Sequence, residues 1–164
     1  MKKLQLYLLT AMVAAITFPA LTSAAPAAAS GTWDDCNFAP SFRAAGPNFV
    51  GTVGITENFF GTLSGTYAGT ERDVVLADGS ATFHGSGIFT GSVAGLSGTA
   101  TFSYEGIAPA GQQIRATWVL VGVSGALLSV KGHGTFDGSF DGFSDACDAG
   151  LYSGSYDGSL NIRP

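Results

Sequence analysis

From residue 50 onward, apolar and polar positions alternate with a period of two along most of the chain. In the segment 83–93, for example, phenylalanine, glycine and valine occupy the odd positions, whereas histidine, serine and threonine occupy most of the even ones. Successive side chains of a β-strand point to opposite faces, so this pattern predicts strands with one apolar and one polar face. After residue 25, no helical period persists for more than two turns, which predicts an all-β protein.

A seven-residue phrase, aromatic-x-Gly-Ser/Thr-apolar-x-Gly, occurs four times within this pattern, at 59–65, 89–95, 136–142 and 152–158. The copies begin at uneven intervals, which excludes the regular period of a solenoid or propeller. We interpret the phrase as a recurrent strand and turn, in which glycine lets the strand bend and a neighbouring aromatic ring covers the bare backbone.

Short turn signals separate the alternating segments, among them Asp78-Gly79, 95–98, 109–111 and Ser124-Gly125. They divide the chain into seven or eight strands joined in sequence order. A flat meander of this size would expose two edges and one apolar face, and closure into a barrel removes both problems. We therefore predict a single antiparallel up-and-down eight-stranded barrel, with a two-sheet sandwich as the alternative.

The beginning of the chain has a different pattern. Two lysines precede an apolar run over residues 4–18, and a tract of small residues follows at 22–25. This order is typical of a secretory signal, and the run is shorter than the roughly 18 residues of a spanning helix. We predict a cleaved signal peptide at 1–25 and a secreted or periplasmic protein without a membrane anchor.

Residues 26–48 contain several prolines and glycines and predict an irregular lead-in, with room for one short strand near Thr32. We expect a disulfide between Cys36 and Cys147 to pin this lead-in to a β-barrel domain at 49–164, because an even pair of cysteines in an exported chain indicates a disulfide. Closing a loop of roughly 110 residues would stabilise the fold by about 4–5 kcal/mol. A redox or metal pair would need a CxxC motif or clustered histidines, and the sequence has neither.

The charge balance excludes some partners and cofactors. The chain has seven Lys and Arg residues against twelve Asp and Glu residues, and two of the seven, Lys2 and Lys3, belong to the predicted signal. An acidic surface argues against nucleic acid or anionic lipid as a partner. His84 and His133 fall on polar faces without a third ligand, and the acidic residues near the C-terminus match no calcium motif. We predict no metal site and no cofactor.

Several turn and packing motifs occur together between residues 59 and 136: Phe-x-Gly before the first turn, Asp-Gly-Ser-Ala at 78–81, a tryptophan before an apolar run, and Gly-x-Gly-x-Phe at 132–136. With them the chain resembles an uncharacterised bacterial family with an allene-oxide-cyclase-like barrel. The resemblance implies an eight-stranded antiparallel barrel shared with allene oxide cyclases and dirigent proteins, relatives that hold apolar small molecules in the barrel. It implies no activity, because the motifs concern turns and packing.

The candidate functional pair comes from strand parity. Glu57 falls on the apolar face of its strand. Continuing the parity of the next strand would place Glu71 and Asp73 inside, whereas a β-bulge would place Arg72 and its apolar neighbours inside and bury more apolar surface. We therefore predict an inward Glu57–Arg72 pair. It could orient a ligand in the barrel mouth; the alternative that we prefer is a rim salt bridge worth about 0–1 kcal/mol.

Four aromatic residues at inward positions are further candidates for lining a ligand cavity, although such residues more often form the core. They are Phe83, Phe102, Tyr104 and Trp118. An eight-stranded barrel can be filled by side chains or hold one small ligand, and glycines in place of larger side chains favour a cavity.

These observations predict an exported barrel that binds a small apolar ligand. We favour a binding protein without enzymatic activity over an enzyme. One alternative is a cyclase or isomerase that acts on an apolar substrate in the barrel. Another is a structural secreted module with a filled barrel. The sequence contains no Ser-His-Asp order, phosphate-binding loop or dinucleotide fingerprint.

Overall fold

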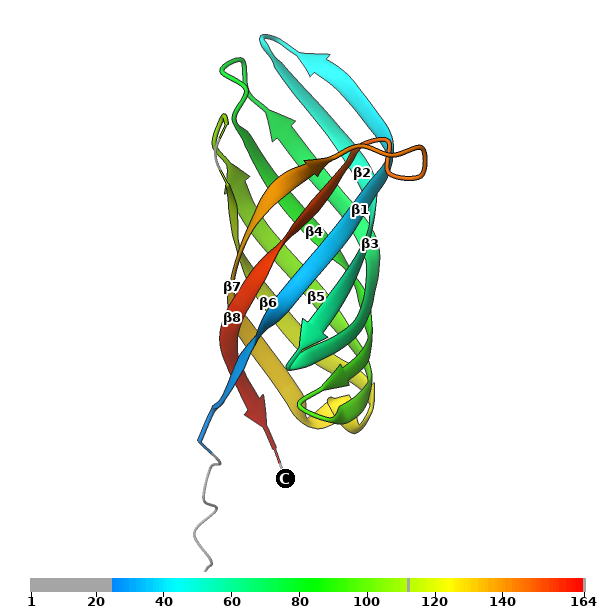
Figure 1. Ribbon diagram of the computed structural model, residues 1–164, viewed down its shortest axis with the longest axis vertical. Coiled ribbons are helices and arrows are strands. Elements are labelled where there is room, and N and C mark those ends of the chain that lie inside the picture. The colour runs from blue at the N-terminus through cyan, green and yellow to red at the C-terminus, as the bar shows by residue number, and fades with distance from the viewer. Residues whose placement is uncertain (1–24, 112, 164) are drawn as a thin grey trace, which may run out of the picture.

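The computed structural model describes residues 25–111 and 113–163, so nearly all of the predicted signal peptide lies outside the described residues. Eight strands and one short 3₁₀ helix follow one another along the chain: β1 (Ala27–Ala45), β2 (Asn48–Gly61), β3 (Leu63–Val75), β4 (Ala81–Val93), β5 (Leu96–Ala108), β6 (Ile114–Gly125), η1 (Ala126–Ser129), β7 (Val130–Gly142) and β8 (Gly150–Ile162). Each strand pairs antiparallel with the next, and β8 pairs with β1 (Figure 1). The predicted eight-stranded antiparallel barrel is confirmed, and the sandwich is excluded.

The predicted irregular lead-in at 26–48 is wrong, because most of these residues form the long strand β1. β1 pairs with β2 on one side and with β8 on the other, and only one irregularity interrupts its pairing, between Phe38 and Ser41 around Pro40. Its inward positions include Gly31, Asp35 and other residues that carry little apolar signal. Two neighbouring strands nevertheless satisfy its backbone groups, so pairing overrides the weak local pattern.

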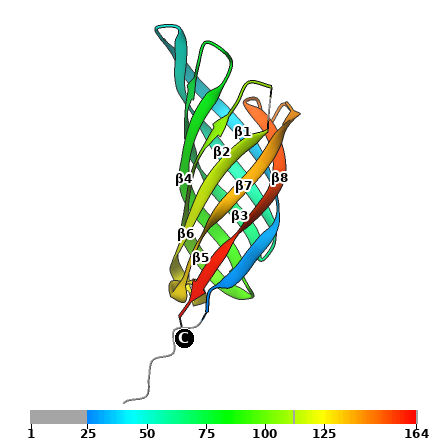
Figure 2. The ribbon, with the colours of Figure 1, turned by 90° about the vertical axis from the view of Figure 1, so that its left-hand side faces the viewer.

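One end of the barrel is closed. The β2–β3, β4–β5 and β6–β7 connections gather there (Figures 1 and 2). Aliphatic side chains fill the space between them, and the largest are fully buried: Leu63, Val93, Leu120, Leu127, Val130 and Leu160. This end is packed like the core of an ordinary globular protein.

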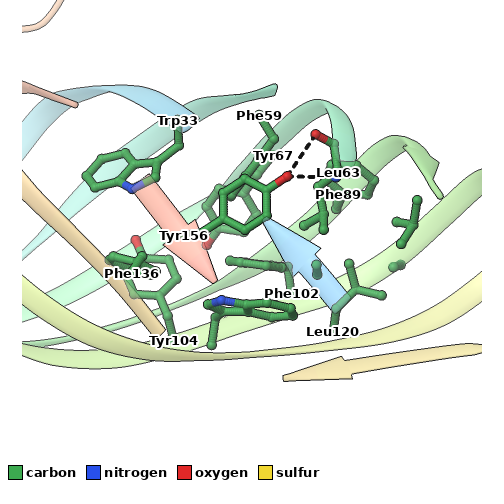
Figure 3. Packing of buried hydrophobic residues seen from close by; sticks show 14 of the residues in the cluster. Trp33, Phe59, Leu63, Tyr67, Phe89, Phe102, Tyr104, Leu120, Phe136 and Tyr156 are labelled. Carbon is green, nitrogen blue, oxygen red and sulfur yellow. Dashed lines mark hydrogen bonds between the residues drawn. The ribbon is translucent and has the colours of Figure 1, made fainter. Parts of the chain in front are cut away.

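Aromatic rings fill the middle of the barrel (Figure 3). Phe102 stacks on Trp118 with 5.9 Å between ring centroids, and Phe59 makes an edge contact with Tyr156 at 5.7 Å. The Tyr156 hydroxyl accepts a hydrogen bond of 2.7 Å from the backbone N–H of Leu63. Phe102 and Trp118, two of the predicted cavity candidates, lie in this packed core and do not line the cavity described below.

Some glycines make room for these rings. A Cβ atom at Gly85 would overlap the ring of Tyr104, and one at Gly138 would overlap the indole of Trp33. The predicted covering of bare glycine backbone by aromatic rings is therefore present at both positions.

The predicted disulfide is present and joins Cys36 on β1 to Cys147 in the β7–β8 connection. Its Cα atoms are 5.1 Å apart. Among the described residues, none belongs to a helix of the length and apolar character needed to cross a membrane.

Candidate functional site: an acidic cavity at the barrel mouth

The end opposite the packed one, called the mouth here, is hollow. The β1–β2, β3–β4, β5–β6 and β7–β8 connections surround it (Figure 1). A cavity of about 390 Å³ lies inside and takes lining residues from all eight strands. Val75, the last residue of β3, and Ile114, the first of β6, line it near the mouth. Phe42 also lines it and is 43% exposed, so the cavity reaches the surface.

The two walls of this mouth cavity differ in chemistry. The wall formed by β1, β2 and β3 carries four carboxyl groups: Asp35, Glu57, Glu71 and Asp73. The wall formed by β4 to β7 carries apolar and aromatic groups: Phe83, Tyr104, Ala108, Ile114 and Phe136. A molecule in the cavity would meet acidic groups on one side and an apolar surface on the other.

The β3 carboxyl groups point inward because the strand continues its alternation without a bulge. Glu71 stands opposite Val53 and Asp73 opposite Gly51 in an uninterrupted pairing with β2, and the pairing with β4 is equally regular. Arg72 is exposed on the outer surface, so the predicted inward Glu57–Arg72 pair is wrong. A bulge would have broken backbone hydrogen bonds on both edges of β3, which outweighs the apolar burial it would gain.

The predicted rim salt bridge is also not formed. Within the described chain, the ion pair present is Arg115–Asp137, at 3.4 Å on the outside of the barrel. Both of its side chains are more than half exposed, so it contributes little to stability.

Glu57 lies deepest among the carboxyl groups. It is 3% exposed, and its Oε2 atom has no hydrogen-bond partner among the described residues. Asp35 and Tyr67 are its direct neighbours on the adjoining strands. Burial raises the pKa of Glu57 well above its usual range, and the negative charges of Asp35, Glu71 and Asp34 add to the shift. Burial therefore favours the protonated, neutral form of Glu57.

Asp35 is also shifted. Burial raises its pKa to about 8, and the charges of Asp34 and Asp141 act in the same direction. The backbone N–H of Tyr152 donates a 3.1 Å hydrogen bond to Asp35 Oδ1 and works against the shift. Desolvation dominates here, since one hydrogen bond does not replace the water that a carboxylate loses.

Glu71 and Asp73 form a coupled pair on β3. Burial raises the pKa of Glu71 to about 9, its neighbour Asp73 adds to the rise, and the Tyr104 hydroxyl opposes it. Burial also raises the pKa of Asp73, which its hydrogen bond with Glu71 partly offsets. Of the two, Glu71 holds a proton more tightly, because it is the more deeply buried and two adjacent carboxylates repel each other when both are ionised.

No basic side chain of the described residues balances these acids. The lining contains no arginine, lysine or histidine. All of those described are exposed on the outer surface: Arg43, Arg72, His84, Arg115, Lys131, His133 and Arg163. Also within residues 25–111 and 113–163, no three His, Cys, Asp or Glu side chains converge closely enough to hold a metal ion.

The β7–β8 connection is fastened over the edge of the mouth. The Cys36–Cys147 disulfide ties it to β1. Two hydrogen bonds add to this: Ala149 N–H donates to the Asn37 carbonyl at 3.0 Å, and Asp148 accepts from Ala39 N–H at 2.9 Å. This edge of the cavity is therefore held in place without a ligand.

Of the residues predicted from the sequence, Glu57, Phe83 and Tyr104 line the mouth cavity. Asp35 was not predicted, because the weak strand pattern of residues 26–48 indicates an irregular lead-in. For Glu71 and Asp73, inward positions were the less favoured of the two possibilities. The regular alternation of β3 indicates the inward positions of both residues. The prediction preferred a β-bulge because a bulge would bury more apolar surface.

The fold and site define a class: a small closed β-barrel, filled at one end and hollow at the other, with an acidic and apolar cavity. The chain belongs to the family of proteins of unknown function DUF3224, which matches residues 31–144. Neither allene oxide cyclases nor dirigent proteins are named by this match, so that part of the resemblance stays a prediction.

A crystal structure of a DUF3224 protein from Shewanella oneidensis has a similar fold. The two chains are 20% identical, and the TM-score is 0.62 over 85% of this chain and 99% of the other. At this identity the likeness concerns the fold alone. No curated protein matches the chain.

Proposed function

We propose that this protein binds one small, largely apolar molecule in the mouth cavity. The observation that carries the proposal is the cavity itself. Its volume of about 390 Å³ falls in the range of small-molecule sites, which are typically concave, mostly apolar and furnished with a few polar groups. The resemblance to allene-oxide-cyclase-like barrels supports the same function, since those relatives hold apolar molecules. The alternative of a structural module with a filled barrel predicts no such cavity.

We further propose that binding takes place outside the cytoplasm. The predicted signal at 1–25 supports export. The Cys36–Cys147 disulfide supports it independently, because such bonds persist mainly in oxidising compartments. A protein fused to a reporter that is active only outside the cytoplasm would test this proposal, and loss of the reporter signal on deleting residues 1–25 is expected.

A second candidate is a cyclase or isomerase that uses a neutral carboxyl group as a general acid. The raised pKa of Glu57 and that of Glu71, about 9, favour it, because acids kept neutral in apolar cavities are typical proton donors. A turnover abolished by Glu57→Gln, with binding of the substrate retained, would support this candidate over simple binding.

The binding proposal is tested through the two tryptophans. The Trp33 indole lies at the cavity and donates to the Ser155 carbonyl at 3.3 Å, whereas the Trp118 indole donates to the Thr135 carbonyl at 3.2 Å in the packed core. Their indole N–H signals in a nitrogen–proton NMR spectrum therefore report on two separate places. Titration with phenyltrimethylammonium or tert-butylbenzene, two compact aromatic probes, should shift the Trp33 signal and leave the Trp118 signal nearly unchanged.

Two matched variants complete the test. Ala108→Phe should fill the cavity and abolish the shift, and Ala68→Phe, the same change on the exposed outer face of β3, should preserve it. If neither probe moves the Trp33 signal, or if both variants behave alike, the binding proposal fails.

A further inference from the structure

The mouth cavity gathers acidic groups without any basic one. Asp35, Glu57, Glu71 and Asp73 share one wall of a single cavity, and every basic side chain of the described chain lies on the outside. Buried carboxyl groups are ordinarily paired or bound to a cation, because removing them from water is costly. The barrel therefore buries four carboxyl groups without placing any basic side chain beside them.

Unpartnered oxygen atoms give a second and independent observation. Glu57 Oε2, Asn37 Oδ1 and the Tyr67 hydroxyl are buried and have no hydrogen-bond partner among the described residues. Glu57 and Asn37 also line the cavity. Their free atoms are acceptors, so a group that offers N–H donors or positive charge would satisfy them. Most buried polar atoms in folded proteins have a partner, so unpartnered atoms in a cavity are places where a bound group can supply one.

The rest of the lining suits an apolar body with a positive end. Trp33, Phe83, Phe136 and Tyr152 surround the space. Trp33 and Phe136 contact each other edge to face at 5.3 Å between centroids, so their positions are fixed by packing. Aromatic faces attract ammonium groups as well as burying hydrocarbon. Since no three acidic side chains converge on one point within the described chain, the wall suits a broad organic cation better than a compact metal ion.

We propose that the ligand of the mouth cavity is an organic cation, an amine or quaternary ammonium compound with an apolar body. This inference rests on the proposed binding function. The cationic group lies against Glu57, Asp35 and Glu71, and the apolar body lies against Phe83, Ile114 and Phe136. The ligand supplies the positive charge that the barrel lacks.

The proposal predicts a pH dependence with a definite sign. Carboxyl groups that are neutral in the empty cavity must release protons to face a cation, so affinity for a permanently charged ligand rises with pH. The groups around Glu57 are acids or phenols on every neighbouring element: Asp34, Asp35, Tyr67, Glu71, Asp73, Tyr104, Asp148 and Tyr152. Burial raises the pKa values of Tyr67, Tyr104 and Tyr152 further. The pH dependence therefore comes from the carboxyl groups, first from Asp35 and Glu71, whose pKa values are about 8 and about 9.

The test compares two probes of the same shape. Phenyltrimethylammonium carries a fixed positive charge, and tert-butylbenzene is its neutral counterpart with carbon in place of nitrogen. We expect phenyltrimethylammonium to bind at least about tenfold more tightly at pH 8, as a desolvated charge pair with cation–π contacts would give. Its affinity should increase from pH 6 to pH 9, whereas that of tert-butylbenzene should stay constant. The Trp33 indole signal measures both.

Two variants locate the effect. Glu57→Gln keeps the shape and prevents the side chain from ionising opposite a bound cation, so it should reduce the affinity for phenyltrimethylammonium by about tenfold and leave tert-butylbenzene unaffected. Glu105→Gln, on the outer face of β5, is the matched control and should change neither. If Glu57→Gln does not fold, as judged by the Trp118 signal, the pH comparison of the two probes on the unaltered protein decides the question.

The outcomes separate the two proposals. Equal or tighter binding of tert-butylbenzene would overturn the organic cation and leave the binding function intact. Absence of binding by both probes would overturn both. Displacement of phenyltrimethylammonium by calcium at constant ionic strength would assign the cavity to a metal ion and also overturn the inference. Selective, pH-dependent binding of phenyltrimethylammonium at Trp33 would support it.

Discussion

Two buried tyrosines, one near the closed end of the barrel and one beside the acidic wall of the mouth, have hydroxyl groups in opposite hydrogen-bonding states. Tyr156, near the closed end, accepts from Leu63 N–H at 2.7 Å, and its own proton faces the carbonyl oxygens of Leu63 and Phe60, each at 3.3 Å. Tyr67, next to the acidic wall, is equally buried, yet its hydroxyl has no partner among the described residues. The hydroxyl of Tyr156 is satisfied within the core, whereas that of Tyr67 lies on the strand position opposite Glu57, beside the acidic wall.

The same contrast extends to the surroundings of the two residues. Aliphatic side chains fill the closed end, where burial stabilises the barrel. Carboxyl groups line the mouth, where burial opposes stability unless the groups stay protonated. One end of the barrel thus provides stability that allows the other end to remain hollow and polar, which is the usual relation between a scaffold and its site.

The largest difference between the two ends should appear when the pH is changed. Asp35 and Glu71 have pKa values of about 8 and about 9 in the folded protein, far above the values of about 4 in an unfolded chain. Between these limits the folded state binds more protons than the unfolded state. The stability that these two groups contribute is therefore full below about pH 4 and is lost as the pH rises to about 9. Each such carboxyl contributes a slope of at most about 1.4 kcal/mol per pH unit.

Denaturant unfolding of the ligand-free protein at several pH values measures this loss. The double variant Asp35→Asn, Glu71→Gln should flatten the dependence, because amides do not titrate, and the outer-face variant Glu105→Gln should leave it steep. A stability that increased from pH 5 to pH 9 would contradict the assignment of neutral acids to the mouth.

The next largest effect should come from removing hydrocarbon at the closed end. Leu160 is fully buried, so Leu160→Ala should destabilise the barrel by about 2–5 kcal/mol through lost burial and the void left behind. Ile114→Ala, at the half-buried rim of the mouth, removes a side chain from a space that is already hollow and should cost clearly less. Thermal unfolding of both variants checks the prediction, and equal losses would show that the two ends are packed alike.

The smallest effect concerns the two tyrosines. Tyr156→Phe leaves the buried Leu63 N–H without an acceptor and should cost about 1–3 kcal/mol. Tyr67→Phe removes a hydroxyl that has no partner in the described chain, so stability should stay the same or rise slightly. The pair is measured by denaturant unfolding at one pH. A larger loss for Tyr67→Phe than for Tyr156→Phe would reverse our interpretation of which hydroxyl is satisfied.

The sequence by itself determined the fold class. Alternation with a period of two, turn signals and glycine next to aromatic residues sufficed to predict an antiparallel eight-stranded barrel, because these patterns are local consequences of strand geometry. The two cysteines of the sequence were also enough to predict the disulfide between Cys36 and Cys147. Inward aromatic positions such as Phe102 and Phe83 could also be assigned from parity alone, although parity could not separate a core ring from a cavity wall.

Only the tertiary structure decided where the site lies. The strand β1 has a weak pattern of its own and becomes visible through its pairing with β2 and β8, which also brings Asp35 beside Glu57. The register of β3 determines that Glu71 faces inward and Arg72 outward. A shift of one residue reverses every side chain of a strand, and the choice depends on hydrogen bonds with distant segments rather than on local preference. The acidic wall of the mouth cavity is the product of that choice.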